Sequence, residues 1–138
     1  MKIRDIIEMA AQSFTTVKMV HSSNFARRGL SLLLPTHSFD RATEVGRGDS
    51  VEEAHVMETL QLFLKAFDNK HPAVVDAFTQ AAQGTPVQIT IKHTMDGGVI
   101  NIPCVIEPIG RNKFKFVVKT IMNKANFKTA QNDIVIVV

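Results

Sequence analysis

The sequence predicts an α+β fold in which N-terminal helices pack on a four-stranded antiparallel sheet. From about Lys2 to Gln83 the chain is mainly helical in pattern, with apolar residues at the three- and four-residue spacing of helices outside Thr15–Leu34. From Pro86 to Val138 they alternate with polar residues at the two-residue spacing of strands. The chain has 138 residues, of which 45% are hydrophobic, and this is enough for one core. We therefore expect a single domain over residues 1–138, with a helical part at about 2–84 and a sheet part at about 86–138.

Three main helices are expected in the first part of the chain. Lys2–Phe14 shows the apolar stripe of an amphipathic helix, and Ser50–Phe67 begins with the Ser-x-x-Glu pattern of a capping box. Ala73–Gln83 is the third, with a proline suited to its first turn and a glycine suited to its end. Thr15–Leu34 shows poor periodicity and is interpreted as a loop. The core-facing stripe expected for the second helix is Val56, Met57, Leu60, Phe63, Leu64 and Phe67.

Four strands are expected after Pro86. Asp96-Gly97-Gly98 is typical of a hairpin turn between the first two, and Gly110-Arg111-Asn112 turns the chain again before the third. The last strand, Asp133–Val138, is almost wholly apolar, which is typical of a strand buried on both faces. We expect this strand to run through the interior of the sheet and not along its edge.

A short stretch before the second main helix gathers four ionisable side chains at positions i, i+3, i+4 and i+7. A helix here would place all four on one face; they are His37, Asp40, Arg41 and Glu44. The helix dipole and Asp40 would act in opposite directions on His37, so this imidazole could take or give a proton near neutral pH. Arg41 could clamp a phosphate, with Asp40 or Glu44 orienting the partners. The alternative is a solvated helix face with His37 as its cap.

A second candidate feature is a basic stretch near the end of the chain. Between Pro108 and Asn132 there are six lysine and arginine residues and no acidic residue. The expected partner of such a surface is a polyanion, nucleic acid foremost. The alternative is a strand edge kept soluble by its lysines. The candidate RNA-binding residues are Arg111, Lys113, Lys115, Lys119 and Lys124.

Absences from the sequence disfavour several kinds of chemistry. No Walker, Rossmann, Gly-x-Ser-x-Gly or EF-hand pattern occurs, and no two histidines have the spacing of a local zinc motif. Neither a cofactor nor a metal is therefore expected. The single cysteine, Cys104, lies in an apolar strand and is expected to be a buried small hydrophobe. No apolar run is long enough for a membrane span or a signal peptide, so we expect a cytoplasmic protein without a membrane partner.

A histidine, an arginine and a basic strand together suit one reaction, the cleavage of RNA by its own 2′-hydroxyl group. That reaction needs a base for the hydroxyl, a cation for the phosphorane and an acid for the leaving oxygen, and it needs no metal. His37-x-x-Asp40-Arg41-Ala42 at a helix start, then a Gly/Asp turn and a second helix with a histidine, resembles the family of RegB-like phage endoribonucleases and RelE-type messenger-RNA interferase toxins. The resemblance covers about Pro35–Leu64 and the general order of helices before an antiparallel sheet.

The resemblance implies a RelE/RegB-like fold and a metal-independent cut in messenger RNA that leaves a 2′,3′-cyclic phosphate. It implies catalytic roles for His37 and for a histidine of the following helix. Glu58 occupies the place expected for that second histidine, and His55 lies about one turn earlier on a similar face. A ribosomal component, a protein inhibitor and a second copy of the chain are the further partners left open. If a phage encodes the chain, the site of action is the cytoplasm of the host cell.

Two other functions agree with the same residues. A non-enzymatic factor could bind nucleic acid or another protein through a basic hairpin at residues 111–128, with strong salt dependence and no cleavage. His55, which lies off the apolar face of its helix, would then be a solvated histidine. A structural protein could instead use the apolar stretch Val135–Val138 as a subunit interface.

Overall fold

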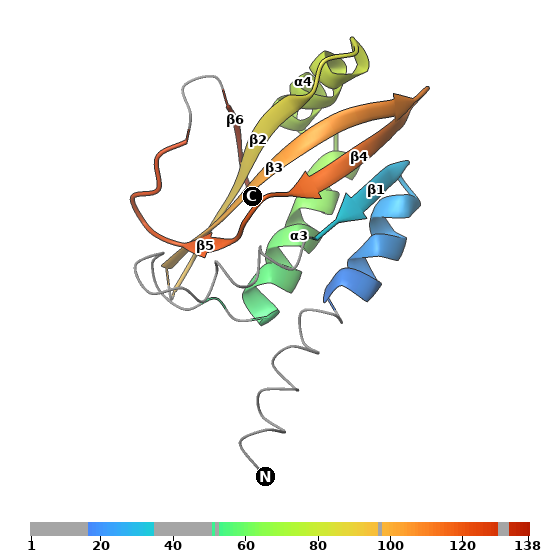
Figure 1. Cartoon of the computed structure of the whole chain (residues 1–138). Helices are drawn as coiled ribbons and strands as arrows, with labels where there is room; N and C mark the ends of the chain where they lie inside the picture. Colours follow the sequence, from blue (N-terminus) through green and yellow to red (C-terminus); the bar gives the residue numbers. More distant parts are fainter. Residues whose placement is uncertain (1–16, 35–50, 52, 97, 130–132) are drawn as a thin grey trace.

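The computed structural model describes residues 17–34, 51, 53–96, 98–129 and 133–138. Within them the chain forms an α+β fold with three helices and a mixed six-stranded sheet. The helices lie on one side of the sheet, behind it in the view of Figure 1. They are residues 17–26, α3 (Glu53–Asp68) and α4 (Pro72–Ala82). The strands are β1 (Leu30–Leu33), β2 (Val87–Met95), β3 (Gly98–Gly110), β4 (Lys113–Val118), β5 (Met122–Asn123) and β6 (Ile134–Val137).

The strands follow the order β1-β4-β3-β2-β6, and β5 pairs with β3 beyond the end of β4. The β2–β3 and β3–β4 pairs are antiparallel, as expected for hairpins. The outer pairs β1–β4 and β2–β6 are parallel, because β1 comes before α3 and α4 and the chain crosses the sheet before β6. The α+β class is confirmed, and the prediction of a purely antiparallel four-stranded sheet is wrong.

Two segments differ from their predictions in the described part of the chain. Thr15–Leu34, predicted as a loop, contains a helix at residues 17–26 and the strand β1. The strand β6, predicted in the sheet interior, is at its edge, where its one neighbour among the described strands is β2. Val135 and Val137 of this strand are 37% and 63% exposed. Apolar sequence on both faces therefore did not mean burial on both faces.

The core lies between the helices and one face of the sheet. Phe25, Phe63 and Phe116 come from the helix 17–26, α3 and β4, and all three are fully buried. Their ring centroids are 6.0 Å apart for Phe25 and Phe63 and 5.1 Å apart for the other two pairs. Such ring pairs stabilise a core beyond the area they bury. The stripe predicted for α3 is confirmed, since its residues are buried or packed against this core.

The start of α4 also follows the sequence prediction. The Nδ1 atom of His71 accepts a hydrogen bond from the backbone N–H of Ala73 at 3.2 Å, so His71 caps the helix. Pro72 occupies the first turn, where its missing N–H costs no helical hydrogen bond. Because His71 serves the helix in this way, it makes a suitable reference position for tests of the other histidines.

The other face of the sheet, which we call the open face, lies on the side away from the helices. The alternation along β4 shows this division, because Phe114 and Phe116 pack toward the core. The side chains of Lys113 and Lys115 therefore leave β4 on the open face. After β4 the chain runs along β3 and then crosses this face to reach β6 on the far side of β2 (Figure 1). We call residues 119–129 the crossing segment.

Candidate functional site

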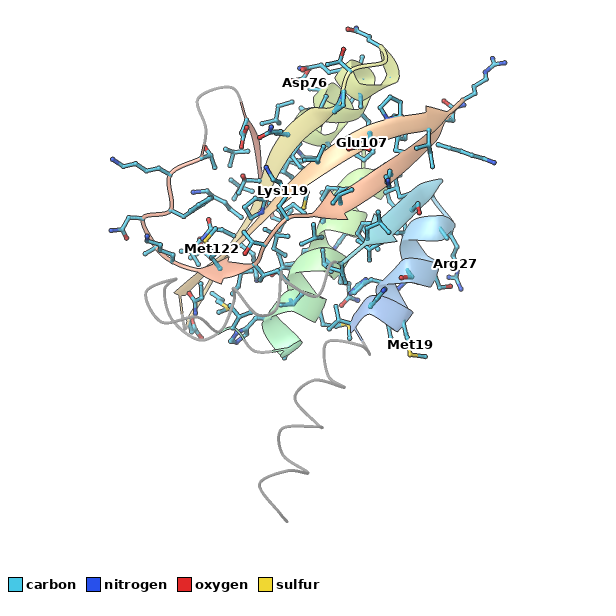
Figure 2. The ribbon with its side chains drawn as sticks, viewed as in Figure 1. Met19, Arg27, Asp76, Glu107, Lys119 and Met122 are labelled. Carbon is cyan, nitrogen blue, oxygen red and sulfur yellow. The ribbon has the colours of Figure 1, made fainter. Side chains whose placement is uncertain are left out.

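The basic residues near the end of the chain gather on and around the open face. In β4 the period-two pattern puts Lys113 and Lys115 there, with Lys113 exposed and Lys115 half-buried. Figure 2 looks onto this face and labels Lys119 and Glu107 on it. Glu107 stands opposite Lys115 in the strand register and is the only acidic residue in the six described strands. The open face is therefore cationic in its charge balance.

The crossing segment is held on the open face by a buried amide network. Asn101, which is fully buried, donates from Nδ2 to the main-chain oxygens of Lys124 at 2.8 Å and Val99 at 3.1 Å. The backbone N–H of Lys124 donates to Val99 O at 2.9 Å, and the Val99 N–H donates to Oδ1 of Asn123 at 3.1 Å. These bonds replace sheet pairing beyond β5 and fix where the exposed Lys124 side chain starts.

A lysine and an aromatic ring anchor the same segment further along. Lys92 leaves β2 on the open face, and its ammonium donates to the main-chain oxygen of Phe127 at 3.1 Å. The same ammonium lies 5.9 Å from the centroid of the Phe127 ring, within the range of a weak cation–π contact. Lys124 and Lys128, on either side of Phe127 in the chain, are exposed. The segment thus adds cations and one aromatic ring to the open face.

The predicted RNA-binding residues are all in the described part of the chain, but they do not form a hairpin. Arg111 is exposed in the β3–β4 turn, Lys113 and Lys115 lie on β4, and the other two belong to the crossing segment. Lys128 was counted in the basic stretch but not among the predicted binding residues. We call this set the basic face: Arg111, Lys113, Lys115, Lys119, Lys124 and Lys128. Its spacing of cations along one side of the sheet suits the backbone of a polyanion.

Four of the predicted catalytic residues, His37, Asp40, Arg41 and Glu44, lie outside the described residues. The fifth, His55, lies in the first turn of α3 and is half-buried. α3 packs on the face of the sheet opposite to Lys113 and Lys115. The structure therefore does not bring His55 together with the lysines of the basic face.

A histidine that was not among the predicted site residues faces α3 from the sheet. His93 is near the end of β2, on the same face as the buried Ile89 and Ile91. Its Nε2 atom is 3.7 Å from Oε2 of Glu58, which follows His55 by one turn of α3. The side chains of His93 and Glu58 are 14% and 57% exposed. The two-residue period of β2 could have signalled this position, since residues 89, 91 and 93 share one face.

The orientation of the His93 ring follows from a second contact. Nδ1 lies 3.0 Å from the main-chain oxygen of Val138, and because that oxygen can only accept, Nδ1 is the donor. Nε2 is then the ring atom that faces the Glu58 carboxylate. A ring held in this way by a backbone oxygen is a common arrangement for acid–base histidines.

Two other polar groups on the helical side make an ion pair and a hydrogen bond within the fold. Arg28 donates to both carboxylate oxygens of Asp68, from Nε at 2.7 Å and from Nη2 at 2.6 Å, and these bonds lower the pKa of Asp68. His21 is 2% exposed, bonds Met57 O through Nε2 at 3.1 Å, and has its pKa lowered by burial. His21 and the Arg28–Asp68 pair line a groove of about 530 Å³ between the helix 17–26 and α3.

Cys104 is buried as expected, and burial raises the pKa of its thiol well above the ordinary value, so it does not suit a nucleophilic role. Across the placed residues, no cluster of three or more histidine, cysteine, aspartate and glutamate side chains could hold a metal ion. No helix within these residues is long and apolar enough to cross a membrane.

The chain matches no family model, no curated protein and no solved structure. Its function is therefore inferred from its own residues and their geometry.

Proposed function

We propose that the protein binds nucleic acid, RNA foremost, through the basic face. The observation that supports this most strongly is the alternation along β4. Phe114 and Phe116 enter the core, so Lys113 and Lys115 lie on the opposite side of a strand that is paired with β1 and β3. The crossing segment, bonded onto the same side, adds further lysines. RNA is preferred over other polyanions because of the resemblance to the RegB-like and RelE-type endoribonucleases.

Binding of this kind depends on phosphate neutralisation and counterion release. Each lysine that contacts a phosphate makes the logarithm of the binding constant fall by about 0.7 per tenfold rise in salt for a single strand. A site built from several such lysines binds strongly at low salt and weakly at high salt. It also carries little sequence preference, because phosphate contacts read no bases.

The test compares lysine pairs on the two sides of the molecule. Lys113→Gln with Lys115→Gln removes two charges of the basic face, and Lys65→Gln with Lys70→Gln removes two exposed charges at the end of α3 and the turn after it. The affinity of each double variant for a labelled oligouridylate is measured by fluorescence anisotropy. We expect the first pair to weaken binding by more than tenfold at low salt and the second pair by less than twofold. Equal losses in both pairs would refute a dedicated basic face.

A second candidate function, metal-independent endoribonuclease activity, is favoured by the His93–Glu58 pair. The reaction needs one group that takes the proton of the 2′-hydroxyl as its oxygen bonds phosphorus. It needs another that gives a proton to the 5′ oxygen as its bond to phosphorus breaks. His93 and Glu58 are 3.7 Å apart and could exchange protons with a substrate at this end of α3. His55 is one turn away from Glu58 on α3. In the sequence, the segment holding His37, Asp40, Arg41 and Glu44 precedes α3.

The two candidate functions use opposite faces of the sheet, so each can be removed without the other. His93→Asn and Glu58→Gln are expected to reduce cleavage of RNA in EDTA by at least a hundredfold while leaving binding unchanged. His71→Asn is the matched control, because asparagine also caps a helix. The product to detect is a 2′,3′-cyclic phosphate. Absence of cleavage by the unaltered protein would leave nucleic-acid binding alone.

A further inference from the structure

Phe127 differs from the other phenylalanines of the described residues. Six of them pack ring on ring in the core between the helices and the sheet, and they are Phe25, Phe63, Phe67, Phe78, Phe114 and Phe116. The seventh, Phe127, makes no aromatic pair with any residue placed in the structure and does not belong to the core cluster. It is half-buried on the crossing segment, on the open face.

The surroundings of Phe127 are cationic. Lys92 approaches its ring from β2, while Lys124 and Lys128 are exposed three residues before it and one residue after it. If the crossing segment needed only an apolar side chain to pack it on the sheet, an aliphatic residue at position 127 would be sufficient. An aromatic ring among lysines instead combines the two features that hold single-stranded nucleic acids, a stacking surface and charges for the backbone.

Resting on the proposed function, we propose that the substrate class of the basic face is single-stranded nucleic acid, with one base stacked on the Phe127 ring. Lys124 and Lys128 then contact the phosphates on either side of that base. A duplex cannot use the ring in this way, because its bases are already stacked on their neighbours. The preference for single strands therefore comes from Phe127, and the general affinity for polyanions comes from the lysines.

The first experiment separates stacking from charge by using two probes. Binding of a twelve-residue oligouridylate and of heparin, a polyanion without bases, is measured for the unaltered protein and for Phe127→Ala. We expect oligouridylate binding to weaken by roughly five- to 150-fold, as when one base loses its stacking partner. Heparin binding is expected to change by less than twofold. Phe78→Leu, a half-buried phenylalanine on α4, controls for loss of a ring elsewhere.

The second experiment uses the absence of tryptophan and tyrosine from the chain. Phe127→Trp creates the only strong intrinsic fluorophore at the proposed stacking position, and it keeps an aromatic ring there. We expect oligouridylate to quench this fluorescence by at least a third and heparin to leave it nearly unchanged. Phe78→Trp, on the helical side, is expected to respond to neither probe.

The outcomes distinguish failure of the inference from failure of the proposed function. The stacking inference is overturned, while polyanion binding stands, if Phe127→Ala changes the binding of oligouridylate and of heparin by the same factor. It is equally overturned if oligouridylate does not quench the fluorescence of Phe127→Trp. If the unaltered protein binds neither probe at low salt, the proposed function is overturned and the stacking inference with it. Selective loss of oligouridylate binding together with quenching supports both.

Discussion

The ammonium of Lys92 lies 3.1 Å from the main-chain oxygen of Phe127 and 5.9 Å from the centre of its ring. This one side chain connects β2 to a segment that is 35 residues later in the sequence. Together with the Asn101 network, it keeps the lysines that follow β4 on the same face as the lysines of β4 itself. The basic face is thus a tertiary feature and not merely a run of charges.

Replacing Lys92 with methionine should loosen the crossing segment without changing the core. The variant keeps most of the aliphatic stem but loses a hydrogen bond from a charged donor, and we expect a stability loss of about 1 kcal/mol. Amide hydrogen exchange should speed up at Phe127 and its neighbours more than in β3. Lys65→Met is the control, and equal exchange in both variants would contradict the anchoring role.

Replacing Glu107 should strengthen polyanion binding, because it is the only acidic residue of the described strands and stands opposite Lys115. Glu107→Gln removes a repulsion toward phosphates, and we expect a two- to fivefold gain in affinity at low salt. Oligothymidylate is the probe, since it has no 2′-hydroxyl and cannot be cut by the proposed chemistry. Glu58→Gln on α3 should not change this affinity. A gain of the same size in both variants would mean that net charge alone matters.

Gly29 and Gly84 offer a matched test of how the turn before β1 is packed. Both have positive φ, +77° and +102°, where a side chain strains the backbone. A Cβ on Gly29 would lie 2.7 Å from the main-chain oxygen of Asn112, whereas nothing lies within 4 Å at Gly84. Gly84→Ala should therefore cost about 1 kcal/mol and Gly29→Ala clearly more, with urea unfolding as the measurement. A smaller loss of stability for Gly29→Ala would show that the turn before β1 does not pack closely on the β3–β4 turn that contains Asn112.

Stability should fall in mild acid because of His21. Burial lowers its pKa in the folded protein, so the unfolded chain binds the proton more readily. The stability due to the neutral ring is complete above the unfolded pKa of about 6.5 and is lost as the pH falls toward the folded pKa. Urea unfolding between pH 7 and pH 5 should show a steeper decline for the unaltered protein than for His21→Leu. If the free energy of unfolding declines equally in both proteins, the pH dependence arises from titratable groups other than His21.

Strong helical periodicity was a reliable guide to α3 and α4. Val56, Leu60 and Phe63 are buried where the spacing placed them, because an amphipathic stripe has one favourable way to meet a sheet. The helix at residues 17–26 was missed because its stripe of Val17, His21 and Phe25 includes a buried histidine, which sequence patterns count as polar. β1 was missed because four residues of sequence Leu-Ser-Leu-Leu are too short to show a period.

Tertiary placement was harder to predict than local structure. The sequence of β6 is apolar at every position, yet its place at the edge is decided by where the crossing segment delivers the chain. His93 and Glu58 are 35 residues apart, and only the packing of α3 on β2 brings them together. The basic face could be anticipated from charge alone, but its position opposite to α3 required the strand register.

The central claim is tested most directly by the salt dependence of oligouridylate binding. The slope of log binding constant against log salt is measured for the unaltered protein and for Lys113→Gln with Lys115→Gln. Binding through the basic face predicts a steep slope that becomes shallower by about 1.4 in the double variant, the share of two phosphate contacts. An unchanged slope in that variant would contradict the assignment of nucleic-acid binding to this face.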